Sequence, residues 1–201
     1  MPVVSESRQS RTLINRNGRL DLISGLIPHD EANRLFAVLQ SKLAWSEEHI
    51  KVYGKFHKVP RLVCWYGDNN VNYRYSGVDH QALPWPPALQ ALRQRVQQVT
   101  GEKFNSVLGN LYRNGQDSMG WHADNEKELG DSPFIASISL GEERIFKVRH
   151  KDGETIKLAL PHGSLLTMSG AFQQYWQHCI PKTSRPRAAR INLTFRNIVG
   201  K

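Results

Sequence analysis

Apolar and polar residues alternate along this chain with two different periods. Between residues 28 and 43 the apolar residues recur every three or four positions, which predicts a helix whose buried stripe includes Leu35 and Leu39. The same spacing predicts a second helix from about residue 86 to 99, closed by Gly101. Both helices lie in the first half of the chain.

Most of the remaining chain follows the two-residue period of β-strands. Residues 45–77 are strand-like and rich in aromatic and basic side chains. Further strands are expected over residues 104–112, 134–140, 145–150, 154–160, 164–168, 175–180 and 190–198. Lys151-Asp152-Gly153 supplies a hairpin turn between two of them.

Two early helices followed by a run of short strands predict an α+β fold, namely a sandwich or jelly-roll barrel with the helices packed on one side. Residues 1–19 are polar, carry several arginines and show little periodicity, so we expect a flexible basic tail. The remaining residues, 20–201, are enough for one domain with a proper core.

The last predicted strand has two distinct faces. Ile191, Leu193 and Phe195 point to one side. The polar face carries Arg190, Asn192, Thr194 and Arg196. By itself such a strand is most simply half-buried, with its polar face in water. Alternatively, the two guanidinium groups can bracket a small dianion.

Composition narrows the class of protein. Hydrophobic content of 39% and charged content of 22% are ordinary for a soluble globular protein. No apolar run approaches the roughly 20 residues of a membrane span, and the N-terminus lacks a signal-peptide core. Cys64 and Cys179 are too few for a disulfide framework. We expect a monomer without membrane association inside the cell, in the cytoplasm or nucleoid of a bacterium or the nucleus of a eukaryote.

Net charge points to a polyanionic partner. The chain carries a formal charge of +9. No acidic residue follows Glu154, whereas lysine and arginine continue to the C-terminus. This distribution favours nucleic acid, although a basic protein can also be merely soluble and basic.

Three residues have the composition of a metal site. His122-Ala123-Asp124 places two ligand types two residues apart, on one face of an extended segment, and His178 lies downstream. Two histidines and one carboxylate form the facial triad of non-haem iron(II) oxygenases, which leaves positions open for a co-substrate and O₂. Zinc accepts the same ligands and remains an alternative.

The order HxD, distant His and Arg-x-Asn-x-x-x-Arg resembles the AlkB family of iron(II)- and 2-oxoglutarate-dependent dioxygenases. The resemblance implies a double-stranded β-helix, or jelly roll, with residues 104–201 as the catalytic core. It implies that His122, Asp124 and His178 bind Fe(II). The 2-oxoglutarate residues that it implies are Asn110, Tyr112, Arg190, Asn192, Thr194 and Arg196.

The implied reaction is oxidative demethylation. Fe(II), 2-oxoglutarate and O₂ hydroxylate an N-methyl group, and the product collapses to formaldehyde and the unmodified base. No further catalytic side chain is required, because the cofactor supplies the chemistry. The implied substrate is DNA carrying N-methylated bases such as 1-methyladenine and 3-methylcytosine.

The aromatic and basic segment 45–77 resembles the duplex-DNA branch of the family, the second and third animal homologues. There Tyr53 matches an aromatic wedge that fills the gap left by a flipped base. Tyr75 matches the residue that stacks on that base, and Tyr73 and Arg61 match pocket or backbone contacts.

Other substrate contacts are expected outside this segment. Glu126 matches an acidic residue that favours cationic, ring-methylated bases. Lys182, Arg185 and Arg187 form a basic loop that resembles a phosphate-binding loop. The same chemistry on RNA or on a methylated protein remains an alternative, as does a non-enzymatic nucleic-acid-binding jelly roll.

Overall fold

The structure is a computed structural model. It describes residues 8–52, 55–69, 71–75, 78–185 and 187–199, and for residues 50–52, 55, 72–75 and 78–81 it describes the backbone only. Among these residues, no helix combines the length and the apolar composition that crossing a membrane would require.

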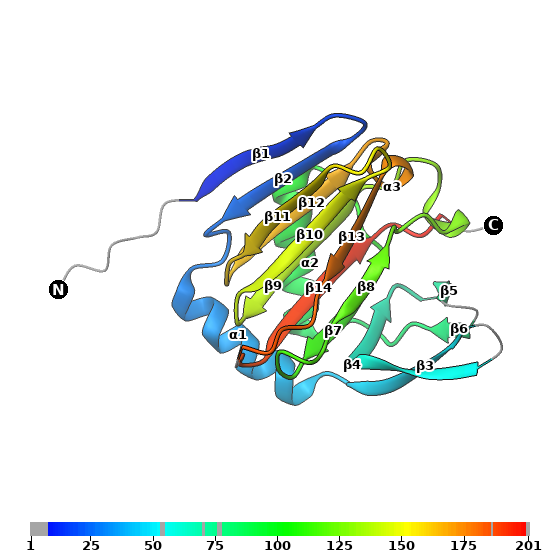
Figure 1. Ribbon diagram of the computed structural model, residues 1–201. Coiled ribbons are helices and arrows are strands. Elements are labelled where there is room, and N and C mark those ends of the chain that lie inside the picture. The colour runs from blue at the N-terminus through cyan, green and yellow to red at the C-terminus, as the bar shows by residue number, and fades with distance from the viewer. Residues whose placement is uncertain (1–7, 53–54, 70, 76–77, 186, 200–201) are drawn as a thin grey trace.

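Two antiparallel sheets lie face to face (Figure 1). The larger sheet has the order β1 (Gln9–Asn15), β2 (Arg19–Ser24), β12 (Ser164–Ser169), β9 (Ile135–Gly141), β14 (Arg190–Arg196), β7 (Ser106–Tyr112), β4 (Lys55–Gly67) and β3 (Ser46–Val52). The smaller sheet has the order β11 (Thr155–Leu160), β10 (Arg144–His150), β13 (Trp176–Ile180) and β8 (Met119–His122). A separate ribbon consists of β5 (Asn72–Tyr75) and β6 (Val78–Gln81).

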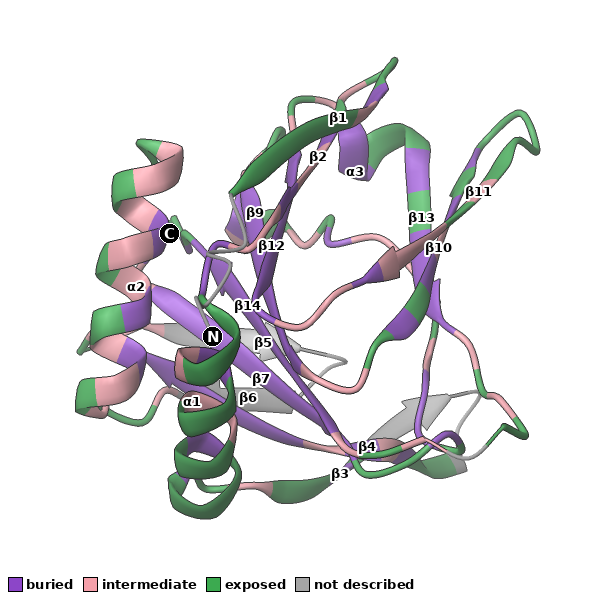
Figure 2. Ribbon diagram, turned by 90° about the vertical axis from the view of Figure 1, so that its left-hand side faces the viewer, coloured by how far each residue is buried: buried purple, intermediate pink, exposed green. Residues whose placement is uncertain are grey.

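The helices are α1 (His29–Lys42), α2 (Pro87–Thr100) and the short α3 (Phe172–Tyr175), together with a 3₁₀ turn at Lys127–Leu129. Figure 2 shows α1 and α2 side by side on the outer face of the larger sheet. As predicted, Gly101 ends α2 in the left-handed conformation, with φ of 76°.

From β7 onward the chain forms a double-stranded β-helix. Strands β7, β9, β12 and β14 form the centre of the larger sheet, and β8, β10, β11 and β13 form the smaller sheet. The predicted α+β jelly roll with two helices on one side is therefore confirmed.

The two faces of β14 point to different sides of the larger sheet. Leu193 and Phe195 belong to an apolar cluster that includes Leu39 of α1 and Leu89 of α2. Burying each such side chain stabilises the fold by roughly 1.5–3 kcal/mol. The opposite face of β14 looks into the space between the sheets, where the functional site lies.

The prediction of a flexible tail over residues 1–19 is wrong from Gln9 onward, because β1 pairs with β2 at the sheet edge. An edge strand needs little apolar pattern, and in β1 only Ile14 is buried. Asn17 and Gly18 both have positive φ in the connecting turn. An Asn-Gly pair favours a hairpin, so the sequence did contain the missing signal.

Candidate metal and co-substrate site

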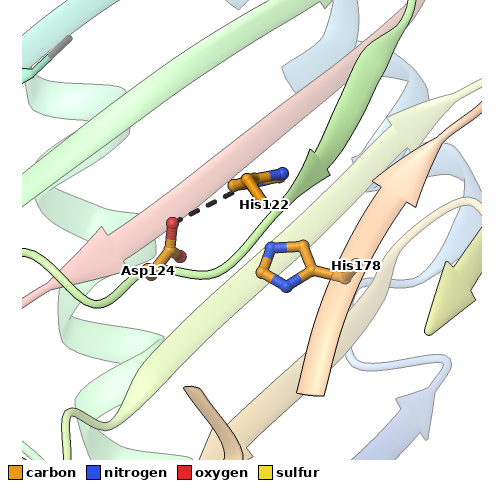
Figure 3. A group of neighbouring side chains, drawn as sticks. All are labelled: His122, Asp124 and His178. Atoms are coloured by element: carbon orange, nitrogen blue, oxygen red, sulfur yellow. Dashed lines mark ion pairs between the residues drawn. The ribbon is translucent and has the colours of Figure 1, made fainter. Parts of the chain in front are cut away.

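The smaller sheet brings the three predicted metal ligands together. His122 ends β8 and is the cross-strand partner of His178 in β13, while Asp124 follows two residues after β8. One ligand atom from each of the three side chains lies within 4.8 Å of the others. His122 Nε2 lies 3.9 Å from Asp124 Oδ1 (Figure 3). This spacing allows a single ion to contact all three residues.

Asp124 is buried and ionised. Arg196 Nη2 donates a hydrogen bond of 2.9 Å to Asp124 Oδ2, and the Asp124 backbone N–H donates to Gln173 Oε1. Burial alone would raise the pKa of Asp124, but the charge of Arg196 and its hydrogen bond outweigh burial and lower that pKa to about 2. The carboxylate is therefore available as an anionic ligand at neutral pH.

His178 is held as a neutral imidazole, the form suited to metal binding. Burial, with the nearby charges of His122 and Arg196, lowers the pKa of His178 to about 3. Its buried Nδ1 has no hydrogen-bond partner in the part of the chain that the structure describes. His122 Nδ1 lies 2.9 Å from the Gly120 carbonyl oxygen, which can only accept, so Nδ1 carries the proton and Nε2 is free to ligate. These residues fit a divalent metal.

The polar face of β14 lines the same cavity as the metal cluster. All the predicted metal and co-substrate residues contribute to that cavity. Every residue of β14 is buried, so the simple interpretation of a polar face in water is wrong. Pairing with β7 sets Arg190 opposite Tyr112 and Asn192 opposite Asn110.

Arg190 is a buried cation that pairs with no carboxylate of the described residues. It donates a hydrogen bond of 2.9 Å from Nη2 to Ser139 Oγ and lies over the Tyr112 ring at 5.3 Å. Its buried Nε and Nη1 make no hydrogen bond to any described residue. Burial lowers the pKa of Arg190 to about 10, so the guanidinium stays charged at neutral pH. Such a group suits an anionic ligand.

Two further predicted co-substrate residues, Asn192 and Thr194, belong to a hydrogen-bonded row. Thr194 Oγ1 donates to Asn192 Oδ1, and Asn192 Nδ2 donates to Ser137 Oγ. Ser137 and Ser139 of β9 were not predicted from the sequence as site residues. Their spacing of two residues in a buried strand was the available signal. Gln173, which orients Asp124 from α3, carried no comparable signal.

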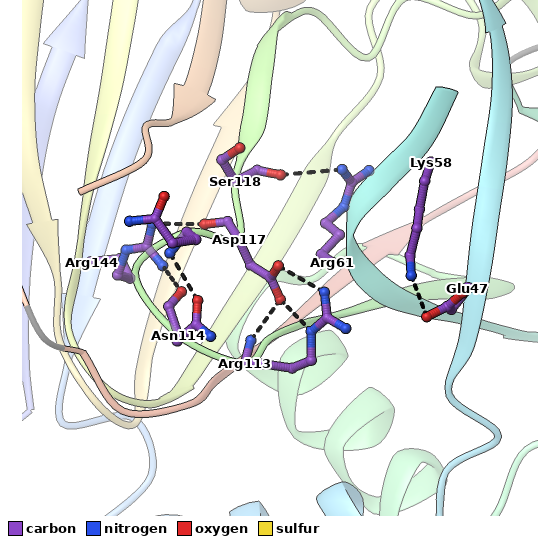
Figure 4. Close-up of polar contacts among 9 residues, drawn as sticks. Glu47, Lys58, Arg61, Arg113, Asn114, Asp117, Ser118 and Arg144 are labelled. Carbon is purple, nitrogen blue, oxygen red and sulfur yellow. Dashed lines mark hydrogen bonds and ion pairs between the residues drawn. The ribbon is translucent and has the colours of Figure 1, made fainter. Parts of the chain in front are cut away.

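Arg61 contacts one of the predicted co-substrate residues, Asn110. It is buried, and its Nε donates a hydrogen bond of 2.6 Å to Asn110 Oδ1. A longer bond of 3.4 Å runs from Nη1 to the Ser118 carbonyl oxygen (Figure 4). Arg61 therefore connects β4 with β7 and with the segment before β8, and its role as a substrate contact stays a prediction.

The other predicted substrate residues lie in varied surroundings. Glu126 is half-buried, and its Oε2 has no hydrogen-bond partner within the described ranges. Lys182 and Arg185 are exposed, whereas Arg187 Nη1 donates to Glu142 Oε1 at 2.7 Å. Tyr53 lies outside the described residues, as do the side chains of Tyr73 and Tyr75 in β5.

Fold and donor set are those of the non-haem iron(II) oxygenases: a jelly roll with a His-Asp-His cluster and open ligand positions. Comparison with known proteins agrees. Residues 19–196 match the 2OG-Fe(II) oxygenase superfamily. Among solved structures, OsALKBH1 aligns with a TM-score of 0.62 at 17% identity, covering 93% of this chain and all of that one. This likeness shows a shared fold.

Curated relatives are more similar in sequence. DNA oxidative demethylase ALKBH2 is 40% identical over 84% of this chain in both cattle and mouse, covering 65% and 76% of those proteins. Human alpha-ketoglutarate-dependent dioxygenase alkB homolog 3 is 39% identical over 90% of this chain. The chain spans just under two thirds of the bovine ALKBH2 and of the human homolog 3, at 65% and 66%. It belongs to the 2OG-Fe(II) oxygenase superfamily and, within it, to the AlkB family. Membership implies Fe(II), 2-oxoglutarate and O₂, which favours iron over zinc.

Proposed function

We propose that this protein is an iron(II)- and 2-oxoglutarate-dependent oxidative demethylase of N-methylated DNA bases such as 1-methyladenine and 3-methylcytosine. The observation that carries the proposal is the single cavity shared by the metal cluster and the polar face of β14. The similarity to proteins named DNA oxidative demethylase supports DNA as the substrate.

His122, Asp124 and His178 would hold the iron, which supplies the activation of O₂ that hydroxylation of a methyl group needs. Arg196 is bonded to Asp124 and so lies at the metal end of β14, with Arg190 at the opposite end of the strand. A dicarboxylate lying along the strand would pair its far carboxylate with Arg190, whose Nε and Nη1 find no partner in the described chain. Asn110, Tyr112, Asn192 and Thr194 would orient it.

The substrate residues would select a cationic base. Glu126 offers a poorly partnered carboxylate two residues beyond the metal ligand Asp124, and ring-methylated bases carry the complementary charge. Tyr73 and Tyr75 would contact the flipped base, Arg61 the pocket wall, and Tyr53 the gap in the stack. Lys182 and Arg185, with Arg187 beside them, would contact phosphates.

Mass spectrometry of methylated oligonucleotides tests the proposal directly. The protein is incubated with Fe(II), 2-oxoglutarate and ascorbate, and with duplex DNA, single-stranded DNA and RNA that carry 1-methyladenine or 3-methylcytosine. We expect loss of the methyl group from DNA and release of formaldehyde. His122→Ala should abolish this loss, whereas His29→Ala, which changes an exposed histidine at the start of α1, should retain it.

Each outcome has a defined meaning. Demethylation of RNA alone would move the substrate to RNA. Binding of nucleic acid without consumption of 2-oxoglutarate would favour a non-enzymatic module. We also propose that the chain from β1 onward acts as one domain and as a monomer, and size-exclusion chromatography with light scattering checks the monomer.

A further inference from the structure

The ribbon formed by β5 and β6 is separate from the two main sheets. Its strands pair with each other in register from Asn72↔Gln81 to Tyr75↔Val78, and no pairing with either main sheet is recorded for the described backbone. A two-stranded ribbon is marginally stable by itself. Its orientation must therefore depend on the stem that joins it to the body.

Backbone hydrogen bonds close that stem. Gly67 N donates to the Leu83 carbonyl oxygen at 3.0 Å, and Leu83 N donates to the Trp65 carbonyl oxygen at 3.1 Å. Asp68 N donates to the Asn105 carbonyl oxygen at 2.8 Å. The chain thus leaves and re-enters the body at one place.

A cluster of three side chains stabilises the same stem. It consists of Asp68, Trp85 and Arg93, and we call it the stem clamp. Arg93 of α2 forms two hydrogen bonds to the Asp68 carboxylate, at 2.6 and 3.0 Å. Trp85 Nε1 donates a third, of 2.8 Å, to Asp68 Oδ1. The Arg93 guanidinium lies over the Trp85 ring at 4.9 Å.

The stem clamp also touches the strand that carries the co-substrate residues. The Trp85 ring stacks on Phe195 of β14, with ring centroids 6.4 Å apart and an interplanar angle of 5°. Phe195 lies between Thr194 and Arg196 in sequence, and its ring points away from the cavity, into the apolar cluster beneath the helices. One contact chain therefore runs from the stem of the ribbon to β14.

We infer that Asp68, Trp85 and Arg93 are positioning residues that fix the β5–β6 ribbon relative to β14, and hence relative to the reacting methyl group. Asp68 precedes the ribbon and Trp85 follows it, so a bond between them holds both ends of the stem. Arg93 anchors that bond to a helix of the main body. This inference rests on the proposed function, because it takes the ribbon to contact the substrate through Tyr73 and Tyr75.

Hydrogen exchange tests the clamp without any substrate. Arg93→Ala should accelerate exchange of the amides of β5 and β6 by roughly tenfold or more, because local opening of the ribbon becomes easier. Asp68→Asn keeps the shape of the side chain and removes its charge, and should act in the same direction. The matched control is Arg95→Ala, two residues along α2, which loses an ion pair of 2.8 Å with Glu31 instead.

A second measurement tests positioning. In Arg93→Ala and Asp68→Asn, KM for a methylated oligonucleotide should rise about tenfold, as expected for lost charge-assisted hydrogen bonds, while kcat stays within about twofold. The affinity for 2-oxoglutarate, measured by the absorption band of the anaerobic iron complex, should not change. Arg95→Ala should leave all of these values at wild-type levels.

The outcomes separate the two ideas. Unchanged exchange in the ribbon, or an equal change in Arg95→Ala, would overturn the clamp. In an active enzyme, faster exchange with an unchanged KM would overturn the positioning role. Faster exchange in a protein whose wild type demethylates nothing would support the clamp while refuting the proposed function.

Discussion

Arg190 and Arg196 share one face of β14, but their electrostatic surroundings differ. Arg196 is bonded to the carboxylate of Asp124, whereas the hydrogen bond of Arg190 goes to a serine hydroxyl. Removing a charge from water costs several kcal/mol, and only a well-placed counter-charge offsets it. We therefore expect Arg190 to destabilise the ligand-free fold, and we expect an anion bound there to relieve the cost.

Replacing Arg190 by methionine should reveal this cost. We expect Arg190→Met to stabilise the ligand-free protein by about 1–4 kcal/mol, since a buried unpaired charge is removed at similar volume. We expect 2-oxoglutarate to stabilise the wild type against heat, and the same variant should lose this stabilisation. Melting curves with and without 2-oxoglutarate measure both effects.

Arg34→Met, on the exposed side of α1, is the control and should alter neither quantity. A less stable Arg190→Met protein that still responds to 2-oxoglutarate would contradict this account.

At the scale of elements, the segment between β7 and β8 fastens several parts of the site together. Asp117 accepts hydrogen bonds from the Arg113 side chain at 2.7 and 2.9 Å, and from its backbone N–H (Figure 4). Buried Arg144 of β10 donates to the carbonyl oxygens of Asn114 and Asp117, and also to that of Pro181 after β13. The segment, which follows β7, is thus linked through Arg144 to the end of β13, the strand that carries His178.

This arrangement predicts a pH dependence of stability. Burial opposes ionisation of Asp117, but the bonds from Arg113 prevail, and the pKa of Asp117 is lowered in the folded protein. A lowered carboxyl pKa contributes stability that is present above the unfolded value and is lost as the pH falls through the folded value. Asp117→Asn should therefore cost on the order of 1–2 kcal/mol at pH 7, and the difference from wild type should shrink below about pH 4. Urea unfolding across that range measures it, and a constant difference would contradict it.

Elements with a strong period were predictable from the sequence, whereas two edge strands, β1 and β8, were not. The alternation in β14 gave its two faces correctly, and the helical stripe around Leu39 gave α1. Strands β1 and β8 lie at sheet edges, where burial imposes little pattern. His122 and His178 are neighbours because of the register between β8 and β13, and no short-range pattern determines that register. Only the resemblance of the whole motif indicated it.

At the scale of the whole molecule, part of the excess positive charge is buried or paired and so is not displayed at the surface. Of the basic residues after Glu154, Arg190 and Arg196 are buried, and Arg187 is paired with Glu142. The exposed cations of the loop after β13 are Lys182 and Arg185. These two, rather than the +9 total, should determine how this side of the protein meets a phosphate backbone.

Salt dependence of nucleic-acid binding distinguishes these charges. Each phosphate contact contributes about 0.9 to the slope of log affinity against log salt for duplex DNA, and about 0.7 for a single strand. The double variant Lys182→Gln, Arg185→Gln should therefore reduce the slope by about 1.8 on duplex and about 1.4 on single-stranded DNA, uniformly across sequences. Arg187→Gln should have a smaller effect, because Glu142 already neutralises that charge.

The control Arg34→Gln, Lys42→Gln changes exposed charges on α1, which covers the outer face of the larger sheet, and should leave the slope unaltered. Equal slopes for the loop and control variants, measured by fluorescence anisotropy between low and physiological salt, would show that the loop does not contact phosphate.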